Sequence, residues 1–399
     1  MIGFSQSAKN MRTSEIRELM ALATRPDMIS FAGGMPNNDL FPLKQVDELY
    51  LSLSPEIKKI GFQYGPTAGY PPLLEAVKTY LKRKGLPVES NGLIITTGSL
   101  QAINLVAKVI VDPGDVVITE YPCFIGGTSI FKSYLANIKS VPINDGGIDL
   151  ALVEEILGSK STKNKMLYIT PYFHNPAGII YSPERKMKVL ELVKKTRILL
   201  LEDDAYGELY FDEKDKEMTV PIKALSDDSE IICYTGSLSK IFGPGMRLGW
   251  LLAPRPVIEK CELAKQSMDA CSPMFTQILA NEFMRSEYFK PYLQELRLAY
   301  SQRCQLMLSS LRDYMPDEVT WTKPKGGFYI WVVLPGYIDS TAVLQKTIKD
   351  GAVFVIGKTF DPVGDRNSCL RLAFSHTPVD KIRSGVEIVA EGIKSFLKE

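Results

Sequence analysis

Short apolar runs recur along the first two thirds of the chain, and helical patterns or turns lie between them. The most restrictive run covers residues 198–201, Ile-Leu-Leu-Leu, in which every residue is apolar. A strand without polar alternation is typical of a sheet that is covered on both faces. Similar runs occur at 93–97, 116–119, 166–170, 231–235 and 248–252. Strands that alternate with helices predict an α/β fold with a doubly wound, mainly parallel sheet.

The pattern changes after about residue 286. A long charged helix is expected near 292–311, strand-like stretches at 326–332, 353–356 and 370–374, and an amphipathic helix at 379–397. These elements predict a smaller α+β domain over 287–399, after a large domain over 43–286. Residues 1–42 are rich in turns, as in Gly33-Gly34-Met35-Pro36, and predict an arm laid over another part of the protein.

Composition narrows the classes of partner. The 399 residues carry 47 Lys and Arg against 46 Asp and Glu, a formal net charge of +1, which disfavours nucleic acid or an anionic membrane as the main partner. Six cysteines without a Cys-x-x-Cys pair, and two histidines, predict neither a structural zinc site nor another metal centre. The scattered cysteines and the absence of a signal-like or membrane-spanning run predict a cytoplasmic protein.

Polar residues follow five of the expected strands, at the points where ligands bind in open α/β sheets. They are Gly98-Ser99-Leu100-Gln101, then Phe124, then Asn175, then Glu202-Asp203-Asp204 with Tyr206, and finally the run from Ser237 to Arg247. Each has an ordinary alternative: a Gly-Ser turn, a core aromatic, an Asn-Pro turn, a solvated acidic loop or, for Lys240, a solvated lysine. A helix that begins at the Gly-Ser turn would favour a bound phosphate.

The acidic run that ends in Asp204 and the lysine Lys240 are the most informative about the chemistry of the site. Three acids at the end of an apolar strand are costly unless a cation or a solvated loop compensates for them. In Ser237-Leu238-Ser239-Lys240, two hydroxyl groups precede an amine, and Arg247 follows seven positions on. This arrangement places an amine beside donors that suit a phosphate, as an amine that reacts with a phosphorylated aldehyde requires.

Together these segments resemble the class I/II aminotransferases, which are fold-type I enzymes dependent on pyridoxal 5'-phosphate (PLP). The matching motifs are Gly-Ser-x-Gln, Asn-Pro-x-Gly, Asp-x-Ala-Tyr and Ser-x-Ser-Lys with its Arg, in this order. Residues 14–18 and 29–36 look like the branch of α-aminoadipate and kynurenine aminotransferases, which also includes the aminotransferase-like domain of MocR-type regulators. The resemblance covers almost the entire chain.

The resemblance implies a role for each matching residue. Lys240 would bind PLP covalently and move the substrate proton, Asp203 would pair with the ring nitrogen, and Tyr206 and Asn175 would donate to the ring oxygen. Phe124 stands where the family often has Tyr, which keeps ring stacking but removes a hydroxyl contact. The phosphate is expected to contact Gly98, Ser99, Leu100, Gln101, Ser237, Ser239 and Arg247.

The resemblance also implies a substrate site and an assembly. Arg371, assisted by Asn175, would bind the substrate carboxylate, and Arg17 and Gly34 would lie near the substrate. Tyr64 would reach the phosphate in a partner subunit, which predicts a homodimer with shared active sites and an arm packed on the small domain and the partner. The expected reaction moves an amino group from an L-amino acid of aminoadipate, aromatic or branched-chain type to a 2-oxo acid.

Two alternatives stay open at this point. The motifs specify cofactor binding more than they specify which bond breaks, so another fold-type I PLP reaction is possible on the same site: a β-lyase, a decarboxylase or a racemase. A PLP-sensing regulatory module is the alternative from another class, and the near-neutral charge argues against it.

Overall fold

The computed structural model describes residues 2–9, 19, 21–22, 25, 27–144, 146–159, 163–226, 230–364 and 366–397. Within these residues, eight strands form one large sheet in the order β2-β9-β8-β7-β6-β3-β4-β5. They are β2 (Asn91–Thr96), β3 (Val116–Tyr121), β4 (Asn137–Asn144), β5 (Gly147–Ile148), β6 (Asn164–Ile169), β7 (Leu199–Asp204), β8 (Ile232–Ser237) and β9 (Gly249–Pro254). The five adjacent strands from β8 to β4 are parallel, whereas β9 runs antiparallel to both of its neighbours, and β5 is antiparallel to β4.

Helices cover both faces of this sheet, as the apolar run at 198–201 predicted. Along β3, Val117 packs in one apolar cluster with α6 (Ser99–Ile110) and α10 (Arg255–Gln266), while Val116 and Ile118 pack in another with α8 (Leu150–Gly158) and α9 (Pro183–Thr196). Successive side chains of a strand point to opposite faces, so the central strands are apolar throughout. The fold is the doubly wound α/β fold that was expected.

Local sequence explains where several helices begin. The hydroxyl of Ser182 accepts a hydrogen bond from the backbone N–H of Arg185, and Pro183 occupies the first turn of α9. Gly98 precedes α6 with a φ of +78° and offers no side chain as a cap. The remaining helices on the large-sheet side are α3 (Leu43–Ser52), α4 (Pro55–Gly61), α5 (Pro71–Arg83), α7 (Ile125–Ser133) and α11 (Met274–Arg285), with 3-10 turns η1 (Asn38–Leu40), η2 (Glu213–Thr219), η3 (Ile222–Leu225) and η4 (Pro244–Met246).

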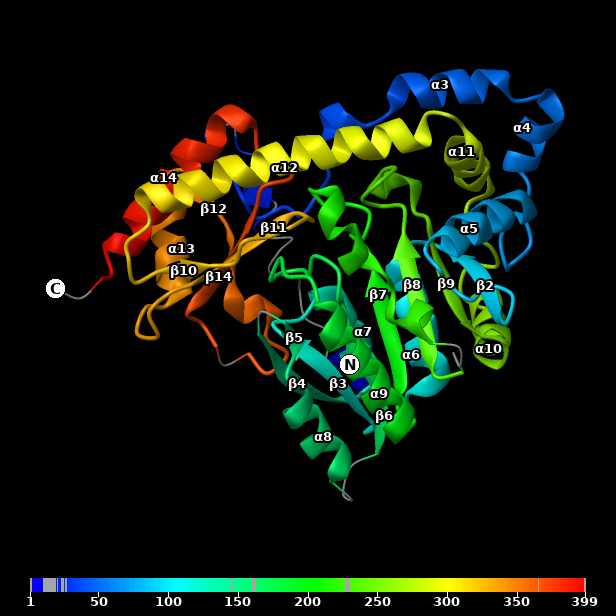
Figure 1. The fold of residues 1–399 in the computed structure, drawn as a ribbon, viewed down its shortest axis with the longest axis horizontal. Helices are drawn as coiled ribbons and strands as arrows, with labels where there is room; N and C mark the ends of the chain where they lie inside the picture. The colour runs from blue at the N-terminus through cyan, green and yellow to red at the C-terminus, as the bar shows by residue number, and fades with distance from the viewer. Residues whose placement is uncertain are drawn as a thin grey trace.

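A smaller α+β unit follows the large sheet. Its antiparallel sheet has the order β10-β11-β14-β13, formed by β10 (Thr320–Trp321), β11 (Tyr329–Val333), β13 (Val355–Ile356) and β14 (Cys369–Ala373). Its helices are α13 (Ser340–Lys349) and α14 (Val379–Lys394), with a 3-10 turn η5 (Gly357–Phe360). The long helix α12 (Phe289–Tyr314) runs along both units and packs on α14 (Figure 1).

The N-terminal segment connects to both units. Short helix α1 (Gln6–Lys9) contacts α7 of the large unit, and strand β1 (Ile29–Ser30) pairs in parallel with β12 (Ala352–Val353) beside α14. The expected single strand at 353–356 is therefore two strands in different sheets, because β13 pairs with β14 instead. From this arrangement we propose that the chain is divided into an arm that ends at residue 42, a large domain over 43–286 and a small domain over 287–399.

Candidate active site

One cavity of about 270 Å³ lies where the carboxyl ends of the large-sheet strands face the small sheet. Strands β2, β3, β6, β7 and β8 all end at this edge, because β9 reverses direction between β8 and β2. The cavity lining contains most of the residues expected from the sequence: Gly34, Gly98, Ser99, Leu100, Phe124, Asn175, Asp203, Tyr206, Ser237, Ser239, Lys240, Arg247 and Arg371.

Three expected residues are placed otherwise. Gln101 does not line the cavity: its side-chain oxygen accepts from the backbone N–H of Thr97 at 2.8 Å, and its amide donates to Asp269 at 2.6 Å. Gln101 therefore stabilises the turn at Gly98 through its bond to Thr97, on the side away from the cavity. Tyr64 also lies outside the cavity, with 84% of its surface exposed. Arg17 lies outside the described residues.

The turn before α6 is shaped for an anion. A side chain at Gly98 would bring its Cβ within 3.0 Å of Arg247 Nη2, and the φ of +78° disfavours other residues. The guanidinium of Arg247 reaches the backbone oxygen of Thr97 at 3.1 Å, so it is held against the helix N-terminus. Backbone N–H groups, a helix dipole and an arginine together favour a phosphate at this point.

Lys240 lies at the centre of the cavity. Its Nζ donates to the backbone oxygen of Gly34 at 3.0 Å. Burial, together with the positive charges of Arg371 and Arg247, lowers the pKa of this amine from 10.5 to about 8. A larger share of the amine is therefore neutral near physiological pH, the form in which it acts as a nucleophile or a base.

The three acids of β7 are buried rather than solvated, because the strand continues through them. Glu202 is held by the hydroxyl of Tyr172 and by two backbone N–H groups. Asp204 accepts from Lys84 at 2.8 Å and from Tyr234 at 2.5 Å. Both of these carboxylates are satisfied within the protein.

Asp203, on the opposite face of β7, faces the cavity. Its Oδ2 accepts from the Tyr168 hydroxyl at 2.9 Å, but its buried Oδ1 has no partner among the described residues. Burial raises the pKa of Asp203 to about 7, and the charges of Asp204 and Glu120 add to the rise, while the Tyr168 bond opposes it. An unpartnered buried oxygen requires a donor, and a protonated ring nitrogen is a donor of the right chemistry.

Arg371 reaches the cavity from β14 of the small unit. Nη1 donates to Asn175 Oδ1 at 2.9 Å and Nη2 to the backbone oxygen of Ala32 at 2.5 Å. Among the described residues, its buried Nε has no hydrogen-bond partner, and no carboxylate pairs with the guanidinium. Since Oδ1 of Asn175 is engaged, the NH₂ of this amide is directed elsewhere and is available as a donor.

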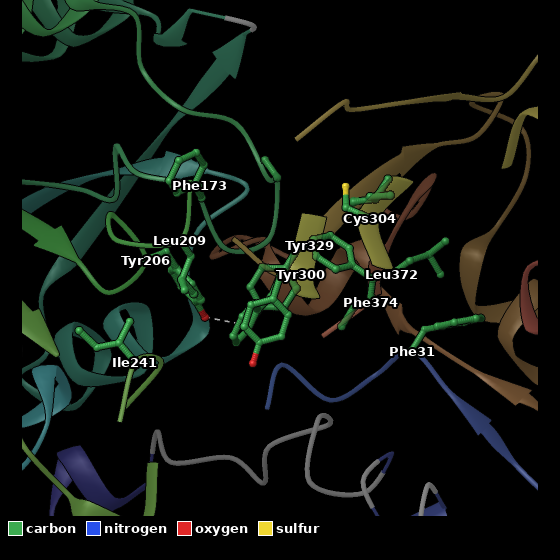
Figure 2. Packing of buried hydrophobic residues seen from close by; sticks show 14 of the residues in the cluster. Phe31, Phe173, Tyr206, Leu209, Ile241, Tyr300, Cys304, Tyr329, Leu372 and Phe374 are labelled. Carbon is green, nitrogen blue, oxygen red and sulfur yellow. Dashed lines mark hydrogen bonds between the residues drawn. The ribbon is translucent and has the colours of Figure 1, made fainter. Parts of the chain in front are cut away.

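Five further residues line the cavity that sequence reasoning did not select: Thr170, Tyr172, Ala205, Pro244 and Tyr329. Four of them are near neighbours of expected residues in the chain. Tyr329 comes from β11, and its hydroxyl lies 2.9 Å from that of Tyr206 (Figure 2). The preceding Gly326-Gly327 pair was a possible signal, since paired glycines before a strand indicate a close approach of the backbone.

The cavity fits a phosphorylated pyridine aldehyde. Lys240 provides the amine, Asp203 an unsatisfied acceptor, and the Gly98–Arg247 corner an anion site. Together with the doubly wound sheet and the small α+β unit, these features define a PLP-dependent enzyme of fold type I.

Comparison with known proteins agrees with this class. Residues 43–389 match the family described as aminotransferase class I and II, and the chain belongs to this family. It is 36% identical to aromatic-amino-acid aminotransferase 1 of Thermococcus litoralis, over 99% of this chain and 95% of the relative. The protein is accordingly a PLP-dependent transaminase.

Two solved structures share the complete fold. The kynurenine aminotransferase of Pyrococcus horikoshii, in complex with PMP, KYN and KYA, superposes with a TM-score of 0.95 at 37% identity, covering 99% of this chain and 98% of that one. LysN, the α-aminoadipate aminotransferase of Thermus thermophilus, complexed with N-(5'-phosphopyridoxyl)-L-leucine, gives a TM-score of 0.86 at 31% identity, covering 98% of this chain and 97% of that one.

Two further expectations concern metals and membranes. Within the described ranges, His, Cys, Asp and Glu side chains form no group of three or more that would hold a metal ion. None of the helices built from those residues is both long and apolar enough to cross a bilayer.

Proposed function

We propose that this transaminase takes the amino group of an L-amino acid of aromatic, 2-aminoadipate or branched-chain type and passes it to a 2-oxo acid, with Lys240 as the catalytic lysine. The observation that carries the assignment is the convergence of three groups in one buried cavity. These are the Lys240 amine, the unpartnered oxygen of Asp203 and the guanidinium of Arg371, which no carboxylate in the described part of the chain neutralises.

The roles follow from the chemistry of each side chain. Bound PLP supplies an aldehyde that combines with amines and a ring that withdraws electrons from the substrate α-carbon. Lys240 would hold the aldehyde through its amine, and the same amine would be the base that takes the proton from the substrate α-carbon. Asp203 would keep a proton on the ring nitrogen, and Tyr206 and Asn175 would donate to the ring oxygen.

The remaining residues bind and orient. The phosphate would be held by residues of the cavity lining, and Phe124 would stack on the ring; the residues for the phosphate are Gly98, Ser99, Leu100, Ser237, Ser239 and Arg247. Arg371 binds the α-carboxylate through the donors that Asn175 and Ala32 leave free, and Gly34 lies beside the substrate. Buried charge-assisted bonds of this kind contribute about 1.5–3 kcal/mol each.

The substrate class rests on the relatives. The names of the three relatives above refer to aromatic amino acids, kynurenine and α-aminoadipate, and one of them holds a leucine adduct. We propose that Arg17, which lies outside the described residues, contributes to the choice among these side chains.

We also propose a cytoplasmic homodimer in which Tyr64 completes the phosphate site of the partner. Exposed apolar side chains gather on α3, α4 and the loop that follows: Leu43, Leu51, Ile60, Phe62 and Tyr64. Such a surface is typical of a subunit interface. The near-neutral charge supports small molecules, rather than nucleic acid or a membrane, as the other partners.

A half-reaction screen tests the proposed reaction. Each candidate amino acid is added alone to the holoenzyme, and conversion to the pyridoxamine form is followed by absorbance, with the oxo acid identified by mass spectrometry. We expect conversion with substrates of aromatic, aminoadipate or branched-chain type, and none with Lys240→Ala. Release of carbon dioxide, of a β-substituent or of the D-amino acid in place of the oxo acid would instead indicate a decarboxylase, a β-lyase or a racemase.

A further inference from the structure

Two tyrosines from different parts of the fold share a hydrogen bond inside the cavity. Tyr206 follows β7 of the large sheet, Tyr329 begins β11 of the small sheet, and their hydroxyl oxygens lie 2.9 Å apart (Figure 2). Their rings meet edge to face with centroids 5.7 Å apart, and both side chains are buried. The roles proposed above use Tyr206 but leave Tyr329 without a function.

The position of the Tyr329 hydroxyl is tightly restricted. A Cβ at Gly34 would collide with the Tyr329 hydroxyl oxygen, so a larger residue at this position would require the hydroxyl to move. The same Gly34 accepts from Lys240 Nζ through its backbone oxygen. The arm, the large sheet and the small sheet thus meet at the tyrosine pair, which leaves the two hydroxyl groups little freedom to separate.

Charged and titratable groups from several elements surround the pair. Arg371, from β14, lies 4.5 Å from the centre of the Tyr329 ring, and Lys240, from the segment after β8, lies 5.7 Å from that of Tyr206. Burial raises the pKa of Tyr329, whereas Arg371 and the bond to Tyr206 act against the rise. Burial raises the pKa of Tyr206 well above 10; the neighbouring Tyr329 and Asp203 add to the rise, and Arg371 opposes it. Each hydroxyl has a single proton, and the role proposed above uses that of Tyr206 for the ring oxygen, so Tyr329 is the donor in the 2.9 Å bond between the two tyrosines.

We propose that Tyr329 is a positioning residue for the cofactor: its hydroxyl donates to the oxygen of Tyr206 and strengthens the hydrogen bond that Tyr206 donates to the ring oxygen of PLP. Consecutive hydrogen bonds polarise one another, so the second donor makes the first a stronger one. The inference rests on the proposed roles of Lys240 and Tyr206.

The consequence is a measurable shift in acidity. Donors on the ring oxygen stabilise its anionic form and make it easier to remove the proton shared with the Lys240 nitrogen. Loss of the Tyr329 hydroxyl should therefore raise the pH midpoint of the absorbance change of the holoenzyme. Tyr329 strengthens an existing charge-assisted hydrogen bond and does not add one to the ring oxygen, so we expect a rise of roughly 0.1 to 0.7 of a unit.

The test is a spectroscopic pH titration of the holoenzyme without substrate. Tyr329→Phe removes only the hydroxyl, and we expect the midpoint to rise. Tyr210→Phe is the matched control: Tyr210 is also buried and forms a β-bridge with Gly326 of the small unit, but its hydroxyl bonds Glu213 outside the cavity. We expect its midpoint to match the wild type. Replacing Tyr329 by 3-fluorotyrosine keeps the hydroxyl and makes it more acidic, and should lower the midpoint.

A double variant separates a relay from an independent contact. If Tyr329 acts through Tyr206, adding Tyr329→Phe to Tyr206→Phe should move the midpoint no further. An unchanged or lowered midpoint in Tyr329→Phe, a raised one with fluorotyrosine, or additive shifts in the double variant would each overturn the role of Tyr329. If Tyr329→Phe does not fold, the fluorotyrosine titration decides. A wild-type holoenzyme that lacks the titrating absorbance, or a Lys240→Ala protein that retains it, would instead refute the proposed role of Lys240.

Discussion

Asp203 and Asp204 are neighbours in β7, yet their carboxylates lie on opposite faces of the large sheet. Asp204 accepts from Lys84 at 2.8 Å and from the backbone N–H of Gly207 at 2.7 Å, whereas Asp203 faces the cavity with one oxygen that has no partner among the described residues. Because side chains alternate along a strand, adjacent acids of similar sequence context acquire different chemistry. One carboxylate serves the fold and the other is available to a ligand.

This division predicts distinct effects of two matched substitutions. Asp203→Asn should retain PLP but lower kcat by orders of magnitude, because the ring nitrogen no longer keeps its proton. Asp204→Asn should instead lower stability, by roughly 1–3 kcal/mol, since Lys84 loses its closest carboxylate and keeps only Glu208, at 3.7 Å. Steady-state kinetics and thermal unfolding of both variants check this. If Asp204→Asn had the larger kinetic defect, the assignment of the two acids would be wrong.

Asp203 also predicts how the stability of the apoenzyme depends on pH. Its pKa of about 7 exceeds the ordinary 3.8, so the folded apoenzyme binds this proton more tightly than the unfolded chain does. The contribution of Asp203 to stability therefore falls as pH rises from about 4 to about 7. Apo Asp203→Asn lacks this loss. Between these limits, its free energy of unfolding should therefore rise relative to that of the wild type by up to about 4 kcal/mol. Urea unfolding at pH 4 and pH 8 measures the difference, and equal pH dependence of the two proteins would contradict it.

The lowered pKa of Lys240 predicts the pH dependence of cofactor uptake. An ordinary lysine with a pKa of 10.5 is neutral in roughly one molecule of three hundred at pH 8, whereas about half of the Lys240 amines should be neutral there. The rate of PLP incorporation into the apoenzyme should rise through pH 8 and level off above it. Stopped-flow absorbance follows the reaction, and a midpoint near 10 would show that burial does not lower this pKa.

Substitution of Arg371 is expected to weaken the binding of every amino-acid substrate. Arg371→Lys keeps a charge, but one ammonium group is unable to hold Asn175, Ala32 and a carboxylate in the planar geometry of a guanidinium. We expect KM to rise about 10- to 100-fold by a similar factor for every accepted amino acid, since all carry the α-carboxylate. The near-UV absorbance of bound PLP serves as a control for the cofactor site. A loss restricted to one class of side chain would place the carboxylate elsewhere.

Local sequence predicted those strands and helix starts that have an apolar run or a capping residue of their own. The apolar runs at 93–97, 116–119 and 198–201 became β2, β3 and β7, and Ser182 with Pro183 began α9. Strand β4 was not expected, because Asn137–Asn144 mixes Lys139, Ser140 and Pro142 with its apolar residues near the edge of the sheet. The extension of β7 through its acids also depends on partners that are distant in the chain.

Site residues that follow the ends of strands could be predicted from the sequence. Residues that reach the cavity only through tertiary packing could not. Lys240, Asn175 and Asp203 follow or end strands of the large sheet, so their convergence follows from the order of the strands. Gln101 was expected in the phosphate site from its position in the motif, but the turn of α6 directs its side chain to Asp269. Tyr329 was not expected at all, because only the packing of the small sheet on the large one brings it to Tyr206.

The position of Tyr64 predicts that Lys240→Ala and Tyr64→Ala subunits, each impaired alone, recover activity when they are mixed. Its side chain is 84% exposed and lies outside the cavity of its own subunit, so a role at the phosphate requires a second copy of the chain. Lys240→Ala and Tyr64→Ala homodimers should each be strongly impaired, the first without turnover and the second with weakened PLP binding. In a mixed dimer, the Lys240→Ala subunit donates its intact Tyr64 to the site that retains Lys240.

That one site carries neither lesion, so random reassociation should restore about a quarter of wild-type activity: half of the dimers are mixed, and each mixed dimer has one intact site of two. The control mixes Lys240→Ala with Asp203→Asn, two lesions that lie in the same cavity, so each site of a mixed dimer stays defective and no activity should return. Absence of recovery in the Tyr64→Ala mixture, with subunit exchange verified by mass spectrometry, would refute the shared site, as would a fully active monomer by light scattering.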